Sequence, residues 1–199
     1  MDVLYKGFSI KVDPDEDQEN PFVSWDTGFE IICGGEFTHL SSISTPPTEY
    51  RKKWTVYGYS HSGLSCALTP YNDRFDSGIL GELFCVADDI PDMDIAVESI
   101  LSNFNNWLSG EVYGYRIFFE KEEIDSCWGF FGDEDYCLSQ AIEYIDGLPD
   151  NFISLKKNEH LISQLEDICD SIMKAPLPYE LKENITLQIQ KAMDYIHEN

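Results

Sequence analysis

The stretch VYGYRIFFEKEEIDSCWGFFG, residues 112–132, decides the fold class of this chain. It holds two runs of bulky β-forming residues, VYGYRIFFEK (112–121) and SCWGFFG (126–132), which are typical of strands. The polar EEID between them (122–125) has the composition of a turn. An antiparallel hairpin is therefore predicted, and with it a sheet in which consecutive strands pair.

Further extended segments are predicted before this hairpin. Residues 3–12 alternate apolar and polar positions, the period-2 signature of a strand with one buried face. Two β-rich runs, WTVYGYS (54–60) and GLSCALT (63–69), lie two residues apart and predict a second hairpin. The remaining predicted segments are strands at residues 28–33 and 82–87 and a long surface loop at residues 36–53.

Helical spacing of apolar residues predicts four helices. The first begins near Asp92 or Asp94 and ends at Gly110, with acidic residues at the end that the helix dipole favours. The other three are predicted at residues 133–146, 155–175 and 181–196. Because only the breaker APLPY separates the last two, they form a helical hairpin. The predicted fold is α+β, an antiparallel β-sheet with two packed helices and a C-terminal helical hairpin.

Charge divides the chain into an acidic α+β domain, residues 1–149, and the helical hairpin, residues 150–199. The whole sequence holds 37 acidic and 13 basic residues, a net charge of -24. The first domain has 28 acidic and 8 basic residues, net -20, and the second has 9 and 5, net -4. A net charge of this size exceeds what solubility requires, and its self-repulsion opposes folding. The charge therefore indicates a function.

The composition excludes several classes of protein. A hydrophobic content of 43% with 14% aromatic residues excludes a disordered acidic tail. The negative field repels nucleic acid and anionic membranes, and it attracts basic proteins, which often bind nucleic acid themselves. Neither direct nucleic-acid binding nor membrane binding is expected. Adaptation to high salt, or solubility alone, stays an alternative explanation of the charge.

Apolar runs, cysteines and glycine-rich motifs indicate the cellular location of the protein and its need for a cofactor. No apolar run reaches the roughly 18 residues that a membrane span needs. The six cysteines are scattered singly, mostly beside apolar neighbours, which is typical of reduced core cysteines. Gly-rich phosphate-binding loops do not occur in the sequence. A cytoplasmic protein without a cofactor is therefore predicted.

The acidic stretch VDPDEDQENP resembles a calcium loop, because Asp13, Asp15 and Asp17 alternate as oxygen ligands do. The spacing does not match the helix-loop-helix calcium motif. With Asp13 as the first ligand, Gln18 and Ser24 stand where that motif needs Gly and Glu. The histidines and cysteines form no CxxC, HxxxH or HExxH spacing. No metal site is predicted, although a looser divalent-metal loop stays open.

The segment SHSGLSC places His61 near Ser62, Ser65 and Cys66, a base close to residues that can act as nucleophiles. A small hydrolase is therefore an alternative, although a turn rich in small residues explains the same letters. The aromatic runs, including the one around Trp128, are assigned to the core and to sheet faces. A non-enzymatic adaptor that binds through these faces or through the C-terminal helices is a further alternative.

The acidic residues gather in four segments, each predicted to be a loop or the start of a helix. Duplex DNA carries one negative charge per roughly 1.7 Å of its axis, so a dense row of carboxylates can occupy the basic groove of a DNA-binding protein. The residues predicted to contact such a partner are Asp13, Asp15, Glu16, Asp17, Asp88, Asp89, Asp92, Asp94, Glu122, Glu123, Asp133, Glu134 and Asp135.

Several ordered motifs carry a family resemblance. YKGFSIKVDPDEDQENP, the HSG and DSG elements of GYSHSGLSCALTPYNDRFDSG, and VYGY followed by DSCWGF appear in this order. Over residues 4–146 the chain resembles a family of largely uncharacterised proteins encoded by phages and other mobile elements. Phe75 stands where that family has Trp, and the C-terminal helices lie outside the resemblance. The resemblance implies a mobile-element setting, in which small acidic proteins block host defence systems by mimicking DNA.

Charge and resemblance together predict a non-enzymatic inhibitor. Its expected partner is a basic, nucleic-acid-binding host defence protein of the restriction or CRISPR type, met in the cytoplasm of the host cell. A homodimer through the C-terminal helices is a further expectation.

Overall fold

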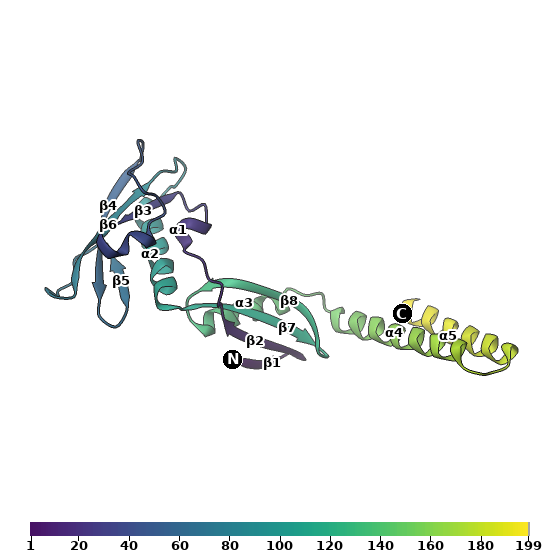
Figure 1. The fold of residues 1–199 in the computed structure, drawn as a ribbon. Coiled ribbons are helices and arrows are strands. Elements are labelled where there is room, and N and C mark those ends of the chain that lie inside the picture. The colour runs from purple at the N-terminus through teal and green to yellow at the C-terminus, as the bar shows by residue number, and fades with distance from the viewer. Residues whose placement is uncertain (199) are drawn as a thin grey trace. The chain divides into compact units, whose positions relative to one another are not determined.

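The computed structural model describes residues 1–198 and confirms an α+β fold with antiparallel strands (Figure 1). The chain divides into two compact units, Met1–Glu143 and Tyr144–Asn199, and the boundary lies within helix α3 (Glu134–Asp146). Every strand of the described residues belongs to the first unit, in which the strands form two four-stranded sheets instead of the single sheet predicted.

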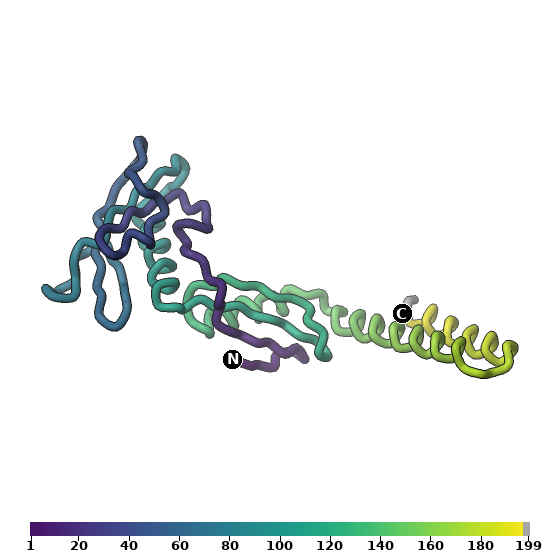
Figure 2. The backbone as a smooth tube through the Cα atoms, in the orientation of Figure 1, coloured from purple at the N-terminus to yellow at the C-terminus, as the bar shows by residue number. Residues whose placement is uncertain are grey.

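The first sheet, called sheet A, has the order β1-β2-β7-β8. Its strands are β1 (Asp2–Tyr5), β2 (Phe8–Pro14), β7 (Val112–Phe119) and β8 (Glu122–Phe131). Figure 2 shows the N-terminal segment, in purple, beside the teal strands, so the sheet joins segments far apart in the sequence. The single strand predicted at residues 3–12 is wrong, because Lys6 and Gly7 adopt positive φ angles of 47° and 87° and turn the chain into a hairpin.

The turn between β7 and β8 also differs from the prediction. Glu120 and Lys121 have φ angles of 47° and 78°, and β8 already begins at Glu122. The EEID segment is therefore strand, with Glu122 opposite Phe119 and Glu123 opposite Phe118. Two left-handed residues match the twist of the flanking strands, and this favours a two-residue turn over a four-residue one.

The two faces of sheet A differ. Phe8, Ile10 and Val12 are buried on one face, where Ile10 pairs with Ile117 and Val12 with Tyr115. Helix α3 lies on this face, since its Cys137 and Ala141 are fully buried and the ring of Tyr136 packs on Phe130 at 6.4 Å. The other face carries the alternate residues, among them Lys11, Asp13 and Arg116.

The second sheet, called sheet B, has the order β3-β6-β4-β5. Its strands are β3 (Phe29–Cys33), β4 (Lys52–Ser60), β5 (Leu64–Ala67) and β6 (Ser77–Cys85). The predicted hairpin of β4 and β5 is confirmed, whereas β6 begins five residues before the predicted strand. The predicted loop at residues 36–53 contains a 3-10 helix, η1 (Gly35–Leu40), and ends at β4.

Helix α2 (Met93–Ser109) packs on sheet B and ends at Gly110 as predicted. Val97, Leu101 and Phe104 are buried against β-strand residues, and Phe22 from the short helix α1 (Pro21–Ser24) packs edge-on against Phe104 at 5.0 Å. Gly110 takes a left-handed φ of 75°, which ends the helix and directs the chain into β7.

The second unit contains helices α4 (Phe152–Lys174) and α5 (Tyr179–Glu198), which contact each other as the predicted helical pair. Both helices begin a few residues earlier than their sequence pattern predicts. None of the helices in the described part of the chain is long and apolar enough to cross a membrane.

Candidate anionic interface

The register of sheet A brings two of the four predicted acidic segments to one end of the sheet. The backbone N–H of Asp15 donates to the carbonyl oxygen of Val112 at 2.8 Å, and Val112 pairs with Phe131. The N–H of Gly132 donates to the carbonyl oxygen of Glu111 at 3.0 Å, and α3 begins two residues later. We call this group the sheet-end cluster; its members are Asp13, Asp15, Glu16, Asp17, Glu111, Asp133, Glu134 and Asp135.

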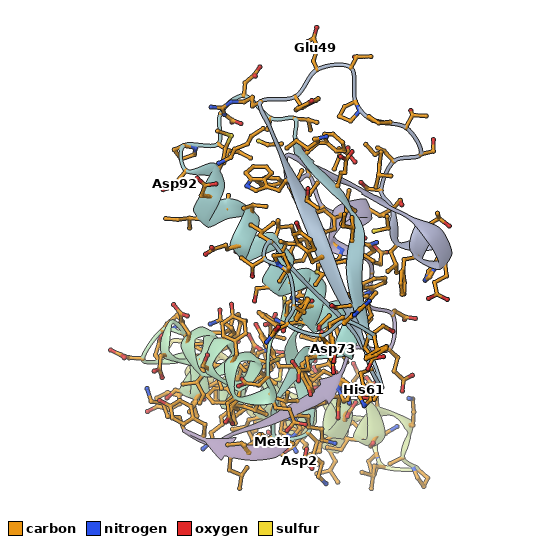
Figure 3. All side chains as sticks on the ribbon, turned by 90° about the vertical axis from the view of Figure 1, so that its left-hand side faces the viewer. Met1, Asp2, Glu49, His61, Asp73 and Asp92 are labelled. Carbon is orange, nitrogen blue, oxygen red and sulfur yellow. The ribbon has the colours of Figure 1, made fainter. Side chains whose placement is uncertain are left out.

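The other two predicted segments lie elsewhere in the first unit. Glu122 and Glu123 open β8, whose ten residues place them about 30 Å from the cluster members that follow Phe131. Glu123 lies nearer to Asp13, because its field reaches Arg116. Residues 88–94 precede α2, whereas Glu111 follows it, and a helix of 17 residues is about 25 Å long. Figure 3 shows Asp92 at the end of the first unit opposite Met1. The thirteen predicted contact residues therefore occupy three separate places.

Several of these carboxylates have structural partners. Asp92 caps α2 by accepting hydrogen bonds from the N–H groups of Asp94 and Ile95, at 3.2 and 3.1 Å. Asp133 accepts from the N–H of Tyr136 in the first turn of α3 at 2.8 Å. Asp94 pairs with Lys52, and this hydrogen bond lowers the pKa of the Asp94 carboxyl. Asp13 is paired with Arg116, and Asp15 Oδ1 accepts from the N–H of Asp17 at 3.1 Å.

Arg116 is the positive charge beside the sheet-end cluster. Its Nη2 atom donates to Asp13 Oδ2 at 2.6 Å, across two adjacent strands. The hydrogen bond to Asp13, followed by the fields of Glu123 and Asp2, raises the pKa of the guanidinium. Arg116 thus neutralises the charge of Asp13 on the open face of sheet A. Among the residues that the structure describes, Asp15, Glu16 and Asp17, which follow Asp13 in the chain, form no salt bridge with Arg116.

An open depression of about 750 Å³ lies at this end of the sheet. It is lined by residues 13–17, Arg116 and Trp128. A smaller one of about 230 Å³ shares Asp15, Asp17 and Trp128 with it. An indole ring beside carboxylates suits a cationic side chain, because the ring face and the acids both attract positive charge.

Trp128 is the residue of this interface that the sequence prediction missed, since its aromatic run was assigned to the core and sheet faces. Its side chain is 47% exposed and covers Gly114, where an added Cβ would lie 2.0 Å from the indole ring. The pairing of β7 with β8 shifts register between Tyr113 and Tyr115, which moves Trp128 over the glycine. No local pattern of residues signals this shift, so the sequence could not place Trp128 in the interface.

The basic triplet of residues 51–53 is bound internally. Arg51 Nη1 donates to the carbonyl oxygen of Asp88 at 2.7 Å and to that of Ile90 at 3.2 Å. Lys52 pairs with Asp94, and Lys53 Nζ pairs with Glu82 at 2.7 Å. These contacts hold the positive charges against sheet B and the start of α2, so they do not form a separate basic surface.

The segment considered for hydrolase chemistry forms a His–Asp pair. His61 Nδ1 lies 2.9 Å from Asp76 Oδ2, and the N–H of Ser60 donates to the carbonyl oxygen of Asp76 at 2.8 Å. The HSG and DSG elements thus meet at one end of β4 and β6. Within the described residues, no hydroxyl or thiol is hydrogen-bonded to His61.

Two of the three candidate nucleophiles, Ser65 and Cys66, are hydrogen-bonded to another group or buried. Ser65 Oγ accepts from the hydroxyl of Tyr71 at 3.3 Å, and burial raises the pKa of the Cys66 thiol to about 12. Among the side chains that the structure describes, no group of three or more His, Cys, Asp or Glu residues is arranged to hold a metal ion.

Comparison of the chain with known protein families, with curated proteins and with solved structures gives no match. The likeness of residues 4–146 to mobile-element proteins therefore stays a prediction from the motifs.

Proposed function

We propose that this chain inhibits a host nucleic-acid-binding defence protein, of the restriction or CRISPR type, by placing carboxylates in its basic cleft. The observation that carries the proposal is the sheet-end cluster, where strand pairing gathers eight acidic residues from three separate parts of the sequence. Seven of the eight are among the contact residues predicted from the sequence.

The charge density of the cluster supports the proposal. Its residues belong to the ends of β2, β7 and β8, three adjacent strands about 4.8 Å apart, and with the flanking loops they extend over about 10 to 15 Å. Duplex DNA presents about six to nine phosphates over that length of axis. Eight carboxylates, reduced by the Asp13–Arg116 pair, come close to this number.

The rigid support of the cluster favours a docking role over a flexible acidic tail. Asp15 and Glu111 are tied to the strand ends by backbone hydrogen bonds, and Asp133 caps a helix. The backbone that carries these carboxylates is therefore already ordered before binding, so less of the electrostatic attraction is offset by ordering of the chain. Trp128 adds an aromatic face for an arginine of the partner.

A second candidate function is a protein-interaction adaptor that binds through aromatic faces. The observation in its favour is the exposure of two apolar side chains, Phe75, at 93%, just before β6, and Ile79, at 71%, within β6. Apolar contact of this kind is insensitive to salt, whereas contact through carboxylates weakens as salt screens it.

The test is a pull-down from a host lysate at low and at high salt, with mass spectrometry of the captured proteins. The test variant is Glu16→Lys/Asp17→Lys and the matched control is Asp88→Lys/Asp89→Lys, which changes the net charge equally at the far end of α2. We expect a nucleic-acid-binding protein to be captured at low salt by the natural chain and the control, and lost by the test variant. Capture that resists both high salt and the test variant would favour the adaptor.

A further inference from the structure

The helices of the second unit leave much of their apolar surface uncovered. No residue of α4 is buried, and Met193 is the buried residue of α5 among those described. Leu161 and Ile168 are 44% and 48% exposed, and Leu181 is 45% exposed. An isolated pair of helices in water does not ordinarily expose this many large apolar side chains.

The uncovered side chains lie beside the contact between the two helices. The half-buried Ile162, Leu165 and Ile172 recur at the spacing of one helix face, which packs on α5. The half-buried Cys169 belongs to the same stripe. Leu161 precedes Ile162 and Ile168 precedes Cys169, so these two exposed residues, seven positions apart, extend the stripe to one side. The apolar arc of α4 is therefore wider than one partner helix covers.

Charge decides which partner fits this surface. Residues 150–199 carry a net charge of only -4, whereas residues 1–149 carry -20. Docking on the acidic part would set the helices against the strongest like charge in the chain. Pairing with the helices of a second copy sets -4 against -4, so electrostatic repulsion is smallest there.

The charges along α4 suit an antiparallel pair. Its first half holds Lys156, Lys157 and Glu159, net +1, and its second half holds Glu166, Asp167, Asp170 and Lys174, net -2. Two of these charges are already paired within the helix, Lys156 with Glu159 and Lys174 with Asp170. A two-fold axis near the middle of the helix brings the basic half of one copy to the acidic half of the other. The same axis sets Leu161 of each copy against Ile168 of the other.

The available area suffices for a stable dimer. A helix of 23 residues is about 35 Å long, and two helices side by side are about 20 Å wide. One face of the pair thus covers about 700 Å², and two copies bury about 1,400 Å² in total, within the range of specific interfaces.

We infer that α4 and α5 pair with a second copy of themselves and form an antiparallel four-helix bundle through the side that carries Leu161 and Ile168. The chain then acts as a dimer with two sheet-end clusters. This inference rests on the second unit alone and does not depend on the proposed function.

The test is sedimentation equilibrium of the full chain over a range of concentrations. We expect a mass of twice 22.8 kDa for the natural chain. The variant Leu161→Lys places a charge in the interface twice, so the association constant should fall at least about 100-fold. Leu187→Lys is the matched control, because Leu187 is 55% exposed on the outer side of α5, two residues from Ile185 and from Ile189.

The possible results separate the occupants of this face. A dimer for the natural chain and the control, with a monomer of unchanged helical content for Leu161→Lys, supports the inference. A natural chain that is monomeric at every concentration overturns it, and a loss of stability of that monomer in Leu161→Lys would show that the face packs within the chain. A dimer that survives Leu161→Lys overturns it as well.

Discussion

The two units of this chain bury their apolar side chains in different ways. The first unit holds all of the buried hydrophobic residues in the described part of the chain except Ile145 and Met193. It forms its core internally and carries most of the negative charge outside. The second unit carries a smaller share of the negative charge, with a net charge of -4 over residues 150–199, and keeps its large apolar residues half exposed. The difference indicates that the first unit is complete as a monomer, whereas the second depends on another surface.

The largest expected effect is on the core of the first unit. Phe104 is fully buried between α1 and sheet B, so Phe104→Ala should lower the free energy of unfolding of that unit by about 3 to 5 kcal/mol. All four tryptophans lie in the first unit, and their fluorescence during urea unfolding therefore reports on it alone. The matched change Leu187→Ala in the second unit should leave that transition unmoved. An equal shift in both variants would mean that the units unfold together.

The second prediction concerns protein concentration. Because a dimer is stabilised by mass action, a tenfold higher concentration should stabilise the helical pair by about 1.4 kcal/mol. Thermal unfolding followed by far-ultraviolet circular dichroism should then show a helical transition that moves upward with concentration. The tryptophan transition of the first unit should stay in place. A helical transition independent of concentration would argue for a self-sufficient second unit.

The third prediction concerns Trp128. Replacing it with alanine should weaken binding of a cationic peptide by about 0.5 to 2 kcal/mol, since the ring face is lost while every carboxylate remains. Trp128→Phe should retain most of the affinity. Because the ring is 47% exposed, the unfolding midpoint should change far less than in Phe104→Ala. The measurement is fluorescence anisotropy of a labelled oligoarginine peptide, and equal affinities for all three proteins would remove Trp128 from the interface.

The smallest effect is the pH dependence of the Lys52–Asp94 pair. The pKa of Asp94 is lower in the folded chain, so the pair stabilises the fold above the ordinary pKa of an aspartate, and this contribution is lost as the pH falls through the folded value. Lys52→Met keeps the aliphatic stem and removes the ammonium group, whose Nζ atom lies 5.0 Å from the centre of the Trp54 ring. Urea midpoints of the two proteins should differ at neutral pH and converge in acid. A gap that persists in acid would assign the effect to packing.

The sequence predicted the elements whose signals are local. Helix α2 has a capping Asp92, a regular apolar spacing and Gly110 at its end, and the structure confirms its limits. The two hairpin turns of sheet A were missed because Lys6–Gly7 and Glu120–Lys121 are not the Asn–Gly or Asp–Gly pairs that mark such turns.

The candidate interface was only partly predictable, because it depends on pairing between distant segments. Most of the carboxylates lie in loops or helix starts, as their sequence predicts, whereas Asp13, Glu122 and Glu123 lie in strands. Their grouping depends on the pairing of β2 with β7, in which Asp13 meets Arg116 from 103 positions away. The position of Trp128 depends on a register shift, which no local pattern of residues predicts.

The central claim is that the carboxylates at the end of sheet A, and not the net charge alone, carry binding. The most direct measurement is the affinity for the labelled oligoarginine peptide at low salt, compared between Glu16→Lys/Asp17→Lys and Asp88→Lys/Asp89→Lys. We predict at least a tenfold loss for the first variant and less than about a twofold loss for the second. Equal losses in the two variants would contradict the claim, because they would mean that the peptide responds only to overall charge.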